Sequence, residues 1–159
     1  LHLLESGEFD SASLARLLNE ASGLKGLTGT EDMADIERRA AEGDEGCRLA
    51  IAVFAHRARK YIGAYAATMG GVDAIAFTGG IGENAAAVRS RSLVGLEAMG
   101  LRIDEARNQA THGVDAEISP PGAAARVFVV PTNEELLIAR DTCHIVAELA
   151  AGRKPEVQP

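Results

Sequence analysis

Apolar residues recur every three or four positions along much of the sequence, a spacing typical of helices that pack one face against a core. The longest predicted helix starts near Asp44 and ends at Gly70. Other helices are predicted from Asp10 or Ser11 to Gly23, and over 85–99, 104–110 and 132–151. The stripe of the longest helix that is expected to face the core is Ala50, Val53, Phe54, Ala58, Tyr61, Ile62, Tyr65 and Met69. The corresponding stripe of the last helix is Ile138, Thr142, Ile145 and Leu149.

Two short apolar runs, 73–78 and Val127–Val130, have strand length instead, and Leu101–Ile103 is a weaker candidate. Loops are predicted at 23–30, which carries a glycine every third residue, and at 112–125, with a polar segment at 31–43. This order predicts an α/β fold in which helices cover a small sheet. We expect one domain over residues 1–151 and a frayed tail over 152–159.

Composition and charge exclude several classes of protein. The chain has 159 residues, 47% of them hydrophobic and 25% charged, so it can bury one core. A net charge of -7 argues against binding to nucleic acid or anionic lipid. No apolar run approaches the roughly 20 residues that cross a bilayer. Cys47 and Cys143 lack metal-type spacing, and we expect them to be reduced core residues of a cytoplasmic protein.

The first candidate site follows the 73–78 strand. Gly79–Asn84 leads from this strand into a predicted helix, an arrangement that presents backbone N–H groups and a positive dipole end to phosphate. Gly80-x-Gly82-x-x-Ala85 also fits a loose dinucleotide fingerprint, with Asp104 at about the ribose-binding distance of 20 residues. On these residues alone, a phosphate site and a purely structural turn both remain open.

The second candidate site follows the other strand. Thr132 and Glu135 have the spacing of a capping box at the start of the last helix, which predicts a structural role for Glu135. Glu134 is not needed by that cap and follows the carboxyl end of a strand, where open α/β sheets bind ligands. A carboxylate at this position can hold magnesium, usually through retained waters.

Both segments resemble the C-terminal half of the acetokinase family. The resemblance lies in Phe77–Asn84 with Val88-Arg89, and in Pro131–Leu136 with Ile138-Ala139 and Asp141. The runs 22–29 and 60–65 are similar as well, so the resemblance extends from Leu1 to about Val146. Two distant motifs in the right order make it specific.

The resemblance implies an actin-like ATPase domain with a ribonuclease H-like core, of the acetate and sugar kinase, Hsp70 and actin superfamily. The family transfers the γ-phosphoryl group of ATP to acetate, giving acetyl phosphate and ADP, and uses Mg²⁺. It also implies a homodimer, and it makes Glu134 the magnesium-side carboxylate. By the same resemblance, the nucleotide would be bound by Asp32, Met33, Gly80, Ile81, Gly82, Glu83 and Asn84.

The chain departs from the family pattern in two ways. Ala34 stands where the family usually has an arginine near the adenosine. Members also have two such domains, and the groups that act on the acyl acceptor lie in an N-terminal domain that has no counterpart here. We therefore assign no catalytic residue to this chain and expect it to be inactive alone, as a fragment or half-length product. Propionate or butyrate kinase, and a non-catalytic dimerisation module, remain alternatives.

Overall fold

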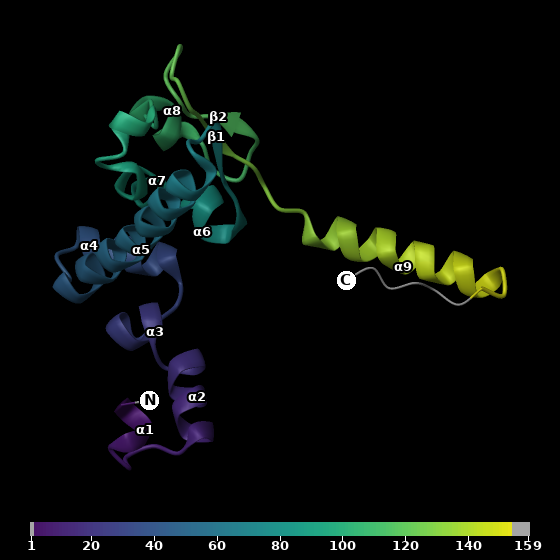
Figure 1. Cartoon of the computed structure of the whole chain (residues 1–159), viewed down its shortest axis with the longest axis horizontal. Coiled ribbons are helices and arrows are strands. Elements are labelled where there is room, and N and C mark those ends of the chain that lie inside the picture. The colour runs from purple at the N-terminus through teal and green to yellow at the C-terminus, as the bar shows by residue number, and fades with distance from the viewer. Residues whose placement is uncertain (1, 154–159) are drawn as a thin grey trace.

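The computed structural model describes residues 2–153, apart from the side chain of Glu134, and shows a helix-rich chain with one small sheet (Figure 1). The first half consists of helices α1 (His2–Glu5), α2 (Ser11–Glu20), α3 (Gly23–Thr28), α4 (Met33–Ala41) and α5 (Glu45–Met69). The second half contains β1 (Ala74–Phe77), α6 (Gly79–Asn84), α7 (Ala86–Leu93), the 3-10 helix η1 (Glu97–Met99), α8 (Glu105–Ala110), β2 (Ala116–Glu117), β3 (Arg126–Val129) and α9 (Glu134–Ala150).

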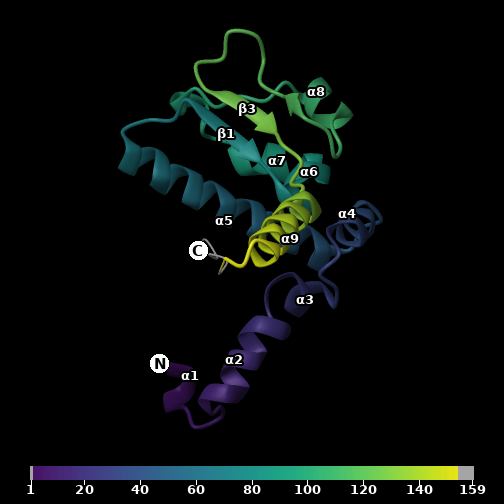
Figure 2. The same cartoon turned by 90° about the vertical axis from the view of Figure 1, so that its right-hand side faces the viewer.

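The sheet has the strand order β1-β3-β2. β1 runs parallel to β3, with Ala74 opposite Arg126 and Phe77 opposite Val129, and β2 is antiparallel to β3. Figure 2 shows the long helix α5 on one side of this sheet. The α/β fold with a small, helix-covered sheet is thus confirmed. The predicted strand at Leu101–Ile103 is reduced to a single bridge between Leu101 and Ala125.

Two clusters of buried apolar residues form the core of the described chain. One joins the helices and consists of Met33, Ile36, Ala40, Cys47, Ala50, Ile51, Ala85 and Val88. The other lies around the sheet and consists of Leu93, Leu96, Leu101, Ile118, Ala125, Val127 and Val129. Because α4, α5 and the start of α7 share the first cluster, they form a rigid block beside the carboxyl ends of the strands.

Several predicted segments differ in the structure. The polar segment 31–43 contains helix α4, because Asp32 caps its start and Met33, Ile36 and Ala40 make one buried face. The loop predicted at 23–30 contains α3. The helix predicted over 85–99 ends at Leu93, since Val94 is extended and Gly95 adopts a positive φ of 82°.

The predicted boundaries of α5 are confirmed, whereas its predicted core stripe is only half right. Asp44 caps its start by accepting a hydrogen bond from the Cys47 N–H, and Gly70 ends it in the left-handed conformation. Ala50 is buried, and Phe54 and Ile62 pack against the two apolar clusters. The exposed members of the stripe are Val53, Tyr61, Tyr65 and Met69. Most of the fully buried side chains of α5 are small, and α3, α4 and α7 pack against this helix.

Helix α9 extends away from the rest of the described chain (Figure 1). Its predicted core stripe is therefore wrong, with Ile138 66% and Leu149 59% exposed, and Cys143 is exposed rather than buried. Of the predicted tail, 154–159 lies outside the described residues. Among residues 2–153, no helix combines the length and apolar character needed to cross a membrane.

Candidate functional site

The two sequence motifs meet at one edge of the sheet. β1 and β3 are parallel neighbours, and the Val130 N–H donates a hydrogen bond of 2.9 Å to the Phe77 carbonyl just beyond their paired ends. The glycine motif follows β1 and the Thr132-Asn133-Glu134 segment follows β3. The carboxyl ends of parallel strands are where open α/β sheets bind ligands, so this edge is the candidate site.

The glycine motif itself forms the short helix α6. Gly79 is its first residue and has a φ of 70°. The side chain of the N-cap residue Thr78 accepts no hydrogen bond from the backbone N–H groups of the first turn. A Cβ on Gly80 would meet no atom within 4 Å, whereas a Cβ on Gly82 would lie 3.1 Å from the Phe77 carbonyl carbon. Gly82 therefore lets α6 pack closely on β1, while Gly80 faces open space.

A cleft of about 440 Å³ separates α6 from the start of α4. The predicted residues Asp32, Met33, Gly80, Ile81 and Asn84 all line it. Ala34 also lines it, so no guanidinium enters the cleft from position 34, while Asp32 caps α4 by accepting a 2.9 Å hydrogen bond from the Ala34 N–H. The volume falls within the range of small-molecule sites.

Gly82 and Glu83 do not line this cleft. The Oε1 atom of Glu83 accepts hydrogen bonds from the Thr132 N–H at 2.9 Å and from its hydroxyl at 2.8 Å. These two bonds hold the pKa of the Glu83 carboxyl below its ordinary value, and they tie α6 to the start of α9. The predicted capping box at Thr132 is thus wrong: Asn133 caps α9 by accepting from the Leu136 N–H.

The candidate metal residue Glu134 begins α9, but its side chain lies outside the described part of the chain. Across residues 2–153 as described, no three His, Cys, Asp or Glu side chains gather in a way that could hold a metal ion. Asp104, considered above as a ribose ligand, caps α8 by accepting a 3.1 Å hydrogen bond from the Arg107 N–H. Its observed role is structural.

Arg89 joins α6 to α8 and to the residue that follows α8 through hydrogen bonds. Its guanidinium is fully buried, and every one of its N–H hydrogens has an acceptor. The acceptors are the carbonyls of Gly82, Glu83, Asn108 and Thr111 and the Asn108 side chain. Desolvation lowers its pKa, against the attraction of Glu37 and Glu105. In the sequence, Arg89 is part of the resemblance to the family, and no local pattern indicates its role.

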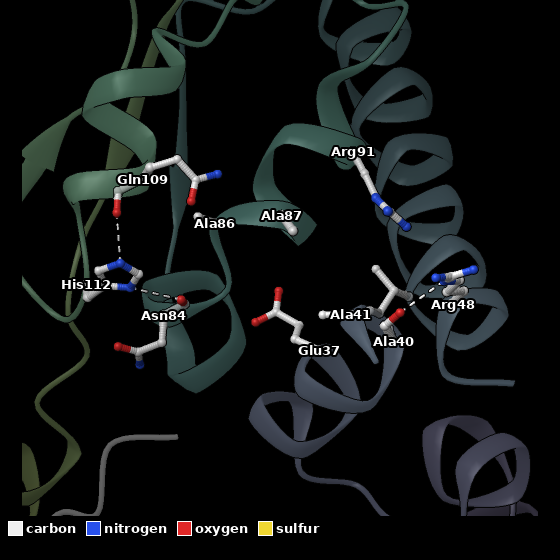
Figure 3. Close-up of a pocket in the computed structure, with 11 residues that line it drawn as sticks. Glu37, Ala40, Ala41, Arg48, Asn84, Ala86, Ala87, Arg91, Gln109 and His112 are labelled. Atoms are coloured by element: carbon white, nitrogen blue, oxygen red, sulfur yellow. Dashed lines mark hydrogen bonds between the residues drawn. The ribbon is translucent and has the colours of Figure 1, made fainter. Parts of the chain in front are cut away.

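A second cleft of about 420 Å³ adjoins the first and shares Glu37 and Asn84 with it (Figure 3). His112 closes one side, with its ring nitrogens 3.1 Å from the Asn84 carbonyl and 2.9 Å from the Gln109 carbonyl. Glu37 was missed by the sequence analysis, because it lies in a segment that was predicted only as polar. Met33 and Ile36, at helical spacing beside it, were the available signal.

The chain is similar to proteins of one known family. The family model described as "Acetokinase family" matches residues 1–140. The chain belongs to the acetokinase family. It is 50% identical over 141 residues to an acetate kinase of Clavibacter michiganensis, an alignment that covers 89% of this chain and 36% of that protein.

Solved structures of the acetokinase family share the fold. The chain matches Porphyromonas gingivalis acetate kinase with a TM-score of 0.83 and 40% identity, over 91% of this chain and 37% of that one. A propionate kinase from Francisella tularensis matches with a TM-score of 0.77 and 34% identity, over 87% and 35%. The chain therefore has the kinase fold of this actin-like ATPase group, and it spans little more than a third of the length of these relatives.

Proposed function

We propose that residues 1–151 are the nucleotide-binding C-terminal domain of an acetate kinase, which transfers the γ-phosphoryl group of ATP to acetate. One observation carries the proposal: Asp32 and Met33, far in sequence from Gly80, Ile81 and Asn84, line the same cleft as they do. These are the residues to which the family resemblance gives the nucleotide. The groups that act on acetate would lie in the remainder of the full protein.

The residues of this chain would bind and orient the nucleotide. Met33 and Ile81 offer apolar surface beside the cleft, and backbone N–H groups at the start of α6 suit phosphate oxygens. Phosphoryl transfer needs mainly such positioning and charge stabilisation from the protein. We assign Gly82 and Glu83 to holding α6 in place rather than to touching the nucleotide.

Magnesium fits this site as an ion held chiefly by the nucleotide phosphates. Mg²⁺ commonly keeps several waters and takes only one or two protein carboxylates, so a preformed cluster of acidic side chains is not required. Glu134, two residues after the Thr132 that is hydrogen-bonded to Glu83 of α6, would supply the carboxylate. When bound, the ion neutralises charge that develops on the transferring group.

The proposal includes a cytoplasmic homodimer. Tyr61 and Tyr65 stack with ring centroids 6.4 Å apart on the exposed face of α5, next to Met69. An apolar, aromatic face of this kind is typical of a protein interface.

The similarity to a propionate kinase favours propionate as the second candidate acceptor.

A chimera tests the proposed activity. In the Clavibacter acetate kinase, the section that matches this chain is replaced by residues 1–159, and acetyl phosphate is trapped as the hydroxamate from acetate and Mg-ATP. We expect the chimera to be active and the isolated chain to be inactive. A folded chimera that lacks activity, beside an active parent enzyme, would contradict the proposal. Propionate in place of acetate tests the second candidate.

In the same chimera, Glu134→Ala should lower turnover roughly 100-fold, because loss of a metal-holding carboxylate removes about 2.7 kcal/mol of transition-state stabilisation. Glu135→Ala is the matched control, since Asn133 rather than Glu135 caps the helix. We expect its turnover to change less than twofold. The turnover of both variants is measured as a function of magnesium concentration. Equal turnover in the two variants would show that Glu134 does not hold the metal.

A further inference from the structure

The carboxyl group of Glu37 lies between the two clefts, and one of its two oxygen atoms has no hydrogen-bond partner among the described residues. The residue lies on α4, lines both clefts, and is not bound by any of the ion pairs that engage its neighbours on that helix. Its Oε1 atom is buried and has no hydrogen-bond partner among the described residues. In Figure 3 the carboxyl group points into the space bounded by Asn84, Ala86 and Ala87.

An unpartnered carboxyl oxygen is costly in the free chain. Burial raises the pKa of Glu37 above its ordinary value, while Arg89, Arg91 and His112 act in the opposite direction. None of these three side chains donates a hydrogen bond to Glu37 among the described contacts, and the Arg89 hydrogens all go to other acceptors. A buried acceptor that lacks a donor is satisfied when a ligand supplies one.

The surroundings of Glu37 fit the edge of a flat heterocycle. On the side of the first cleft, its neighbours in the lining include Met33, Ile81 and Ala85, which present apolar surface. Gly80 lies in the same lining, with open space where a side chain would stand. A nucleoside diphosphate with its phosphates near the start of α6 would therefore bring its base towards the carboxyl of Glu37.

We propose that Glu37 determines nucleotide specificity by accepting a hydrogen bond from the exocyclic amino group of the bound purine. This inference rests on the proposed nucleotide site and adds the group that reads the base. The 6-amino group of adenine and the 2-amino group of guanine share the required chemistry. A purine without an amino group leaves the carboxyl oxygen unpaired, and sites of this kind reject such analogues strongly.

The test removes the amino group from the ligand and the carboxyl group from the protein. Dissociation constants of this chain are measured by calorimetry for ADP against purine riboside 5′-diphosphate, and for GDP against IDP. In wild type, we expect the amino-bearing ligand of one pair to bind tenfold or more tightly than its partner. The pair that shows the preference identifies the base. In Glu37→Ala the ratio should fall to about one.

Two further variants keep the result interpretable. Glu37→Gln retains an acceptor oxygen of similar reach, so it should keep part of the preference for the amino-bearing nucleotide. A variant that changed only the packing of the cleft would affect both nucleotides of a pair equally. Glu42→Ala is the matched control, because Glu42 is exposed at the end of the same helix and pairs with Arg38. Its ratio should equal that of wild type.

The outcomes separate this inference from the proposed function. If nucleotides bind but the wild type shows no preference in either pair, or Glu37→Ala or Glu37→Gln keeps the full preference, Glu37 does not read the base and the nucleotide site stands. If no nucleoside diphosphate binds to the wild type, both are overturned. Melting curves check that each variant is folded. Should Glu37→Ala fail to fold, the ligand pairs measured on wild type and Glu37→Gln decide.

Discussion

Gly80→Val should weaken the binding of ADP at least tenfold while leaving the stability of the chain almost unchanged. Gly80 lines the first cleft, and a Cβ at this position would meet no atom of the chain within 4 Å. The added side chain would therefore occupy space that is free in the chain and that the proposed nucleotide fills. Glycine is also a poor helix former, so the change does not reduce the helix propensity of α6.

Gly82→Val is the matched variant in the same helix, with the opposite expectation. Its Cβ would lie 3.1 Å from the backbone of Phe77, so the side chain would force α6 away from β1. Overpacking of this kind costs roughly 1–3 kcal/mol. Calorimetry with ADP and urea unfolding measure the two effects. If Gly80→Val bound ADP as wild type does, or destabilised the fold as much as Gly82→Val, the assignment of the cleft would be wrong.

Arg89→Met should destabilise the chain by roughly 3–5 kcal/mol, the usual cost of removing one partner from a buried charged network. The fully buried guanidinium is the donor for four carbonyls and for the Asn108 side chain, and methionine leaves these acceptors without hydrogen bonds. Arg89→Lys should also destabilise the chain, because a single ammonium group cannot replace the planar fork. Urea unfolding of the three proteins gives the values.

Arg91→Met is the control for this experiment, because Arg91 lies on the same helix but is exposed. Its free energy of unfolding should change by less than about 0.5 kcal/mol. Because Gly82 and Glu83 are both held by Arg89, the Arg89 variants should also weaken ADP binding under conditions where they remain folded. A stable Arg89→Met protein would show that the network does not hold α6.

Local signals in the sequence were enough to predict α5, β1 and β3, but not α4, which forms one wall of the first cleft. Asp44 and Gly70 mark the ends of α5 because a cap and a left-handed glycine act within one helical turn. The two apolar runs predicted β1 and β3, and their parallel pairing brings the two motifs to one edge. The resemblance grouped Asp32 and Met33 with Gly80, Ile81 and Asn84, which line one cleft.

The features that the sequence did not predict depend on contacts between distant residues. Thr132 has the spacing to cap α9 with Glu135, yet its hydroxyl and N–H both bind Glu83, 49 residues away. Arg89 looks like an ordinary helical arginine until its acceptors in α6 and beyond α8 are known. Hydrophobic spacing likewise gave α9 a core face, but spacing cannot say whether another element covers that face.

The location of the nucleotide tests the central claim most directly. A chain labelled with ¹⁵N is titrated with Mg-ADP, and the shifts of its backbone amide resonances are followed to saturation. We expect the largest shifts to cluster at residues 32–37 and 79–85, on the two sides of the first cleft. Saturable binding whose shifts cluster elsewhere, or the absence of any saturable shift in the folded chain, would contradict it.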